Sequence, residues 1–117
     1  MRWNRWLVGL SLFVLLLLTS CVNSALTVRS LAELEPPEQY NHPYDGPIDE
    51  RVMPVTEVQA LCMSMGAPSS GMACAWVTRG ICFTVLPSDG QAPVPVYRRH
   101  EIAHCNGWPA NHPRDEG

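Results

Sequence analysis

The chain has 117 residues, of which 46% are hydrophobic and 16% are charged, and its formal net charge is −3. The hydrophobic residues concentrate at the N-terminus, where Arg2 and Arg5 also lie. Without these two arginines, six arginines and no lysine remain against eleven acids, a net charge of −5. The sequence therefore has no basic patch of the kind that nucleic-acid binding requires, and nucleic acid is not an expected partner.

Residues 1–20 have the pattern of a secretory signal peptide, with a positively charged start and then an apolar stretch over residues 7–18. This stretch is shorter than the ~20 residues of a typical membrane-spanning helix. It ends in Leu-Thr-Ser-Cys at residues 18–21, which resembles the lipobox of bacterial lipoproteins. The resemblance implies cleavage before Cys21 and acylation of that cysteine. The alternative is an ordinary secretory leader in which Cys21 is incidental.

By this resemblance, the protein is anchored to a lipid bilayer in the bacterial cell envelope and faces the periplasm or the exterior. Several acyl chains on Cys21 would hold it stably, whereas a single chain binds a membrane only marginally. The next residue is Val22 and not an aspartate, which in a Gram-negative lipoprotein implies the outer membrane over the inner membrane.

Residues 21–49 are expected to form a flexible tether between the lipidated cysteine and a domain at residues 50–117. The segment contains four prolines and five acidic residues, a composition that disfavours a packed element. Tyr40, His42 and Tyr44 are accordingly expected to be unstructured or draped over the domain.

The domain is expected to begin with a short strand and a helix. Residues 51–55 predict an edge strand, because Pro54 excludes a central position. Thr56 and Gln59 have the spacing of a capping box, which predicts a helix over residues 57–64. Apolar residues at helical spacing give this helix one buried face.

Two β-prone runs, at residues 72–78 and 81–86, flank Arg79-Gly80 and predict a β-hairpin. A loop at residues 87–93 follows it. The predicted fold class is therefore α+β: a helix, a β-hairpin or small antiparallel sheet, and a C-terminal helix.

The C-terminal helix is expected over residues 95–105. Pro93 and Pro95 stand at its start, where a missing backbone N–H is tolerated. Gly107 favours a left-handed helix stop, and Pro109 prevents continuation.

This helix contains His-Glu-x-x-His at residues 100–104. Residues four apart lie on one helical face, so His100 and His104 project together and can bind one zinc ion, with Glu101 one step round the helix. The motif resembles the active-site signature of the zincin metallopeptidases, over about the last third of the mature chain. The resemblance implies a minimal zincin-like domain with Glu101 as the catalytic base. The alternative is a pair of surface histidines beside a chance glutamate.

A catalytic zinc site usually has three protein ligands and a water. In the related metzincin pattern the third histidine would fall at Ala110, so the chain departs from that pattern. His112, beyond the turn at residues 107–109, is the expected third ligand, and Asp115 is the alternative ligand. His112 could instead be a solvent-exposed loop histidine.

The implied function is a membrane-anchored zinc-dependent hydrolase, a peptidase that acts on a peptide or protein at the cell envelope. Zinc lowers the pKa of water, and Glu101 would accept a proton from it and pass it to the leaving amine. Tyr97, three residues before His100, is either an oxyanion donor or an aromatic residue that packs beside the site. The alternative function is a non-catalytic metal-binding or structural lipoprotein.

Five cysteines are many for a short chain, and lipidation of Cys21 leaves four. An even remainder in an oxidising compartment predicts two disulfides, which a domain with a small core needs for stability. The preferred pairing is Cys62–Cys105, which joins the two helices, with Cys74–Cys82 across the hairpin. The main alternative is Cys62–Cys74 with Cys82–Cys105.

Overall fold

The structure is a computed structural model that describes residues 31–68 and 71–114. The predicted signal peptide, Cys21 and the alternative ligand Asp115 lie outside these residues. From Leu34 onward the described residues belong to one compact unit. No helix within the two described ranges is both long and apolar enough to cross a membrane.

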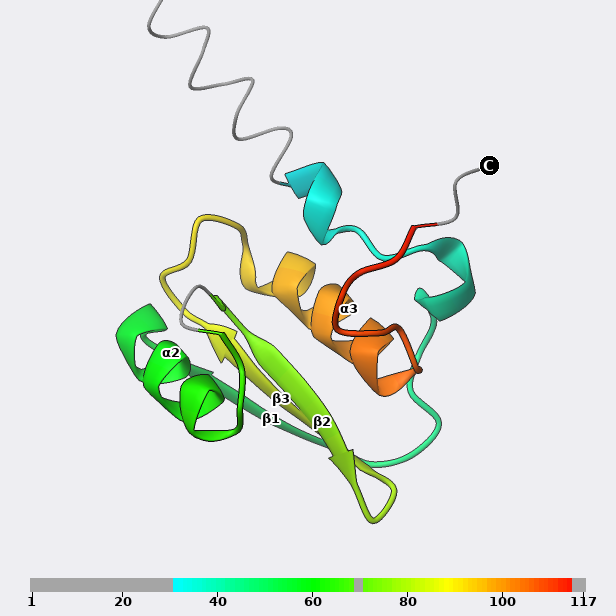
Figure 1. The fold of residues 1–117 in the computed structure, drawn as a ribbon, viewed down its shortest axis with the longest axis horizontal. Helices are drawn as coiled ribbons and strands as arrows, with labels where there is room; N and C mark the ends of the chain where they lie inside the picture. The colour runs from blue at the N-terminus through cyan, green and yellow to red at the C-terminus, as the bar shows by residue number, and fades with distance from the viewer. Residues whose placement is uncertain (1–30, 69–70, 115–117) are drawn as a thin grey trace, which may run out of the picture. The chain divides into compact units, whose positions relative to one another are not determined.

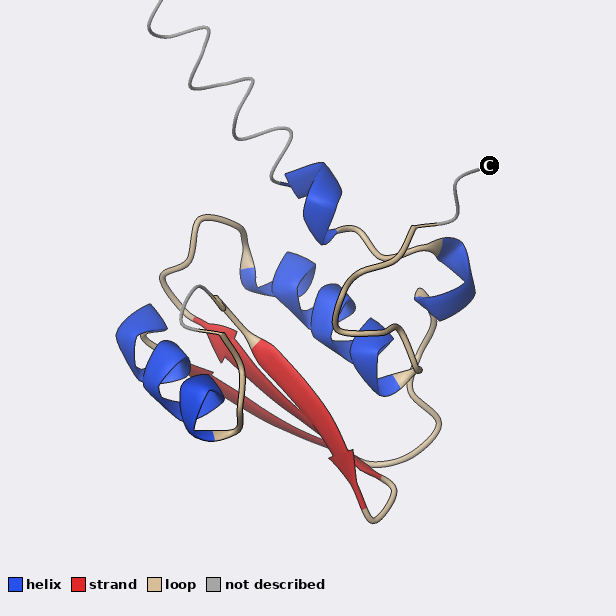
Figure 2. Cartoon of the chain, in the orientation of Figure 1, coloured by secondary structure: helices blue, strands red, loops and turns tan. Residues whose placement is uncertain are grey.

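The unit has an α+β fold built on a three-stranded mixed sheet. Its elements in chain order are η1 (Glu38–Tyr40), β1 (Ile48–Met53), α2 (Val55–Ser64), β2 (Cys74–Thr78), β3 (Ile81–Pro87) and α3 (Val94–Cys105). The strand order is β1-β3-β2, with β3 in the centre. Figure 1 and Figure 2 show α2 and α3 on opposite sides of the sheet, so the unit has three layers.

The direction of the strands confirms one expectation and corrects another. β2 and β3 pair antiparallel on either side of Arg79 and Gly80, which confirms the hairpin. The prediction of an antiparallel sheet is wrong for β1, which pairs parallel to β3 with Ile48 beside Cys82. α2 and β2 lie between these two strands in the sequence, and a crossover of that length permits parallel pairing.

The start of α2 also differs from its prediction. The helix begins at Val55, so Thr56 lies inside the first turn, and the N-cap residue Pro54 makes no side-chain cap. The predicted capping box is therefore wrong. Instead, the Val55 N–H donates to Asp89 Oδ1 over 2.7 Å. A side chain from the loop after β3 thus caps the helix, and no local pattern could have indicated it.

Side chains of β3 alternate between two apolar clusters, one under each helix. Val85 faces α2, and Leu86 faces α3. The α2 cluster comprises Val58, Cys62 and Val85, surrounded by Met53, Leu61, Ala67, Cys74 and Trp76. The α3 cluster comprises Leu86, Ala92 and Tyr97, surrounded by Leu34, Met72, Ala73, Val94 and Val96. Each helix therefore has a core of its own.

Each disulfide joins a helix to a strand: Cys62 is bonded to Cys74, and Cys82 to Cys105. The preferred pairing, Cys62–Cys105 with Cys74–Cys82, is therefore wrong, and the alternative pairing is the one observed. Cys74 lies opposite Val85 in the hairpin register. Cys82 is three residues from Val85, so it points to the other face of the sheet. Each strand cysteine therefore bonds the helix on its own side.

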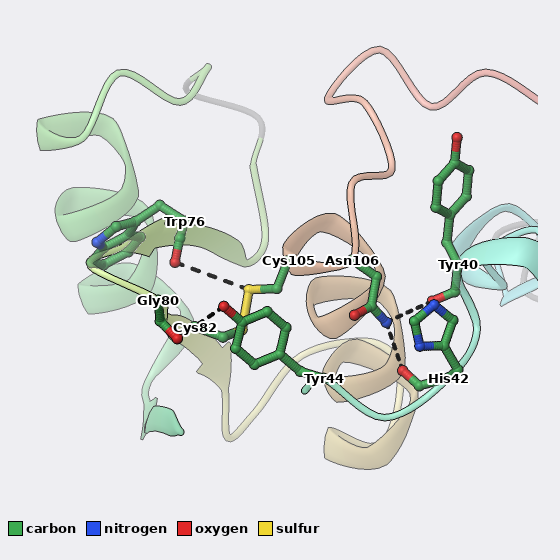
Figure 3. Close-up of a disulfide and its surroundings, with 8 residues drawn as sticks. All are labelled: Tyr40, His42, Tyr44, Trp76, Gly80, Cys82, Cys105 and Asn106. Atoms are coloured by element: carbon green, nitrogen blue, oxygen red, sulfur yellow. Dashed lines mark hydrogen bonds between the residues drawn. A yellow bond between two sulfur atoms is a disulfide. The ribbon is translucent and has the colours of Figure 1, made fainter. Parts of the chain in front are cut away.

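The proline-rich segment before β1 packs against the domain. Asn106, just past α3, donates its side-chain amide to the carbonyl oxygens of Tyr40 at 3.0 Å and His42 at 2.6 Å, as Figure 3 shows. The compact unit begins at Leu34. The prediction that residues up to 49 form a flexible tether is therefore wrong for the part that follows Leu34, which is draped over the domain.

Candidate metal centre

The C-terminal end of α3 turns the chain back along the helix. The Gly107 N–H donates to His104 O, and the Trp108 N–H donates to Ala103 O, both over 3.0 Å. These two bonds form a Schellman motif, and Gly107 has the left-handed φ of 103° that the motif favours. The predicted glycine stop is therefore confirmed, and it returns Trp108 over the last turn of the helix.

A second turn brings His112 back to the helix. Its N–H donates to Pro109 O over 2.9 Å, and the indole N–H of Trp108 donates to Pro113 O over 3.0 Å. His112 has a φ of 55°, a left-handed conformation that costs a residue with a side chain roughly 1–3 kcal/mol. Strain of this kind is concentrated at functional sites, so the backbone itself marks His112 as a residue of interest.

Three imidazoles meet here, which we call the three-histidine cluster: His100 and His104 from α3, and His112 from the loop. Their Nε2 atoms are 3.0 Å apart for His100 and His112, 3.0 Å for His104 and His112, and 3.3 Å for His100 and His104. The cluster runs from the buried His100 to the exposed His112. The fold thus brings together three predicted ligands, and together they could hold a metal ion.

Backbone carbonyls orient the two helical rings. His100 Nδ1 lies 2.8 Å from Leu34 O, and His104 Nδ1 lies 2.8 Å from Trp108 O. Because a carbonyl oxygen can only accept, each Nδ1 carries the proton and each Nε2 presents a lone pair to the cluster. A histidine held from behind in this way is the usual arrangement for a metal ligand.

The facing lone pairs favour a cation between the rings. With Nδ1 bonded to a carbonyl, the neutral forms of His100 and His104 cannot donate through Nε2, and a proton on His112 Nε2 can serve only one of them at a time. Burial lowers the pKa of His100 to about 4, although the hydrogen bond to Leu34 O acts in the opposite direction. The neighbouring histidines also lower this pKa. Burial also lowers the pKa of His112. Both rings are therefore neutral near pH 7, as metal ligands must be.

The separations between the Nε2 atoms fit a tetrahedral metal ion. With Zn–N bonds of about 2.0–2.1 Å, two ligand nitrogens of a tetrahedral site lie about 3.3–3.4 Å apart. The observed separations of 3.0, 3.0 and 3.3 Å differ from this value by a few tenths of an ångström at most. Neutral imidazoles also suit copper and nickel. The geometry therefore supports a metal site without selecting zinc.

Trp108 lacks a predicted role, yet it contacts all three imidazoles. Its ring stacks on His104 with centroids 5.0 Å apart and meets the rings of His100 and His112 edge-on at 5.0 and 4.9 Å. The side chain is only 2% exposed. The signal for it in the sequence is its place directly after Gly107, where a Schellman turn returns the chain to the helix.

Glu101 lies on a different face of α3 from the two helical histidines. Tyr97, Glu101 and Cys105 are four residues apart and form one stripe of the helix. This stripe faces β3, because Tyr97 clusters with Leu86 and a disulfide joins Cys105 to β3. Glu101 is only 4% exposed, and burial raises its pKa to about 8. Among the residues that the structure describes, no carboxylate belongs to the three-histidine cluster.

Thr84 lies on the face of β3 that carries α3, because it is two residues from both Leu86 and Cys82. Thr84 is fully buried, and its hydroxyl has no hydrogen-bond partner in the part of the chain that the structure describes. The interface between α3 and β3 therefore buries two polar side chains.

Tyr97 lies in the core and not among the imidazoles. It is 3% exposed, and its hydroxyl oxygen accepts the Ala92 N–H over 3.4 Å. A Cβ at Gly90 would come within 2.8 Å of the Tyr97 ring and hydroxyl, so the ring fills the space beneath that loop. These contacts are those of a packing aromatic residue, the alternative to the predicted oxyanion donor.

No protein-family model matches the chain, and no curated protein or solved structure is significantly similar to it. Any functional conclusion therefore rests on the site itself. The candidate metal site consists of the three-histidine cluster and the carbonyls behind His100 and His104.

Proposed function

We propose that this protein is a membrane-anchored zinc-dependent hydrolase that cleaves peptide bonds at the bacterial cell envelope. The three-histidine cluster supports a metal site, and the zincin-like signature at residues 100–104 supports zinc and peptide hydrolysis. The lipobox-like sequence at residues 18–21 supports anchoring through Cys21. Two disulfides suit the oxidising compartment that such an anchor implies.

The observation that carries the proposal is the approach of three Nε2 atoms to 3.0–3.3 Å of one another, with two of the rings held by carbonyls. Three imidazole ligands leave one position of a tetrahedral metal for water or substrate, as in catalytic zinc sites, whereas structural sites generally fill all four. The exposure of His112 gives solvent access from that side of the cluster.

In this proposal His100, His104 and His112 hold zinc, which when bound supplies a water of lowered pKa and polarises the scissile carbonyl. Glu101 would accept a proton from water and give it to the leaving amine. A pKa raised to about 8 lets this carboxyl take either protonation state near neutral pH, which transfer in both directions requires.

The test compares Glu101→Gln with Glu57→Gln in the full chain with its disulfides intact. Both variants replace a carboxylate by its amide, but Glu57 is exposed in the first turn of α2. We expect both to bind one zinc ion per chain. Only Glu101→Gln should lose hydrolysis of a mixed fluorogenic peptide library, by about 100-fold or more. Full activity in Glu101→Gln would reject Glu101 as the base, and stoichiometric zinc in His112→Ala would reject the third ligand.

A second candidate function is a non-catalytic metal-binding or structural protein, and the burial of Glu101 favours it. At 4% exposure, on the stripe that faces β3, this carboxyl meets water and substrate only if the packing changes. This candidate predicts zinc binding in the wild type and in Glu101→Gln, a gain in stability with zinc concentration, and no hydrolysis in either protein.

A further inference from the structure

β1 is a terminal strand of the sheet, and among the described residues no other strand pairs with its outer edge. Ile48 and Val52 lie on the face that carries α3 and are 43% and 46% exposed. The side chains of Asp49 and Arg51 lie on the other face, where Arg51 Nε is 4.0 Å from Asp49 Oδ1 in an exposed ion pair, and they are 49% and 61% exposed. An exposed strand edge with apolar side chains is a site at which another strand can add.

The ladder between β1 and β3 determines which backbone groups of residues 48–53 remain free. The Cys82 N–H donates to Pro47 O at one end, and the Ser88 N–H donates to Met53 O at the other. In a parallel ladder alternate residues bond to the same neighbouring strand. The odd-numbered residues of β1 therefore direct their N–H and C=O groups toward β3, and the even-numbered residues direct theirs outward.

A second copy of the chain fits this edge with Glu50 on a two-fold axis perpendicular to the sheet. Such an axis makes the two strands antiparallel and joins each face to the same face of the second copy. The outward-directed residues then meet in hydrogen-bonded pairs, Ile48 with Val52 of the second copy and Glu50 with itself. Asp49 meets Arg51 of the second copy in a non-hydrogen-bonded pair, where opposite side chains come closest.

Three other symmetric arrangements place Asp49 or Arg51 opposite the same residue of the second copy. Parallel pairing about an axis along the strands puts Asp49 opposite Asp49 and Arg51 opposite Arg51. A shift of the antiparallel register by one step in either direction puts Asp49 or Arg51 on the axis, against its own copy. The chosen register also places Glu50 against its own copy, but among these arrangements it alone pairs Asp49 with Arg51 of the second copy.

We propose that β1 joins two copies of this chain into a homodimer with one continuous sheet. Glu50 at the axis is neutralised within each copy by Arg98, which donates to both carboxylate oxygens at 2.7 and 2.8 Å. One short strand from each copy buries less than the roughly 1,200–2,000 Å² of a stable interface, so the dimer is reversible. This inference does not depend on hydrolysis or on a metal.

The test is a charge-swap series in the full chain, with the mass in solution measured by sedimentation velocity over a range of concentrations. The wild type is expected to shift from one chain toward two as its concentration rises. Asp49→Arg and Arg51→Asp each create two pairs of like charges in the dimer, one on each side of the axis. Each should therefore weaken association by about tenfold or more. The double variant exchanges the two charges and should restore association.

Glu57→Arg makes the same change of charge on α2, away from β1, and should associate like the wild type. Because Asp49 and Arg51 are exposed, the swaps should leave near-ultraviolet circular dichroism and both disulfides native. A wild type that stays monomeric at every concentration would overturn the proposal and leave the edge to an extended peptide. Single reversals without effect, or a natively folded double variant that stays monomeric, would also overturn it.

Discussion

The two helices of this protein are built alike. α2 follows Pro54 and α3 follows Pro93, and each helix ends two residues before a glycine with positive φ, Gly66 or Gly107. Both helices end in the same pair of Schellman hydrogen bonds. Each also has a cysteine in its last turn that a disulfide joins to the sheet. We call α2 with the sheet face that it covers the α2 half, and α3 with the opposite face the α3 half. The two halves therefore end a helix and fix it to a strand in the same way.

The halves differ in what they bury. The α3 half buries three polar side chains, those of Thr84, His100 and Glu101, whereas the buried residues described in the α2 half are apolar. Burying polar groups costs stability unless partners compensate, and the carbonyls behind the imidazoles compensate only in part. The α2 half is therefore expected to contribute more to stability, whereas the α3 half carries the buried polar side chains and the candidate metal site.

Removing one side chain from each half should separate binding from stability most strongly. His104→Ala removes a predicted ligand and should lower zinc affinity by at least about 100-fold. Val58→Ala opens the α2 cluster and should cost roughly 2 kcal/mol of stability with zinc affinity unchanged. Competition with a chromophoric chelator measures the first quantity, and urea unfolding of the metal-free protein measures the second. Wild-type zinc affinity in His104→Ala would remove the distinction between the halves.

Local signals were enough to predict what most segments form. Gly107 predicts the end of α3 and Arg79-Gly80 the hairpin, because such residues act through backbone conformation within a few positions. His100 and His104 could be placed together for the same reason, since four residues make about one helical turn.

Contacts between distant segments had no such signal. Cys74 and Cys82 are close in the sequence, yet strand alternation sends them to opposite faces. The carbonyl that orients His100 belongs to Leu34, at the start of a segment whose composition predicts disorder. Which backbone group a side chain meets depends on the assembled fold, so this part of the site could not be predicted.

Removing either disulfide should lower the free energy of unfolding by about 2–4 kcal/mol. Cys82–Cys105 spans 23 residues and Cys62–Cys74 spans 12, so the first should contribute more to stability. Replacing Cys82 and Cys105 by serine should also weaken zinc binding, because that bridge fixes the turn of α3 that carries His104. Replacing Cys62 and Cys74 by serine should leave zinc binding unchanged. Thermal unfolding and chelator titration of both serine pairs measure the two effects. Equal zinc affinity in both pairs would show that the sheet contact of α3 does not position the cluster.

The α3 half should also make the stability of the metal-free protein depend on pH in both directions. Burial lowers the pKa of His100 from 6.5 to about 4, so between these values the unfolded chain binds the additional proton and stability falls as the pH drops. Burial raises the pKa of Glu101 from 4.5 to about 8, so the folded chain retains the additional proton and stability falls as the pH rises through this window. At about 1.4 kcal/mol per pKa unit, the full shifts correspond to losses of roughly 3 kcal/mol for His100 and roughly 5 kcal/mol for Glu101.

Two amide substitutions separate these opposing dependences. Glu101→Gln should abolish the loss of stability above pH 4.5 and keep the loss below pH 6.5 that His100 causes. Glu57→Gln, on α2, should keep both. Urea unfolding across this pH range measures the difference, and an alkaline loss that persists in Glu101→Gln would exclude this carboxyl as its source.

The smallest expected effect comes from the two matched glycines, Gly66 and Gly107. Their φ values are 93° and 103°, and a Cβ at either position meets no atom within 4 Å, so alanine costs only backbone strain, about 1 kcal/mol. Gly66→Ala should lower stability and leave zinc affinity unchanged. Gly107→Ala should lower stability equally and weaken zinc binding by about threefold to tenfold, because this turn positions the Trp108 carbonyl that orients His104. Equal zinc affinity in the two alanine variants would mean that the turn after α3 only terminates a helix, as the turn after α2 does.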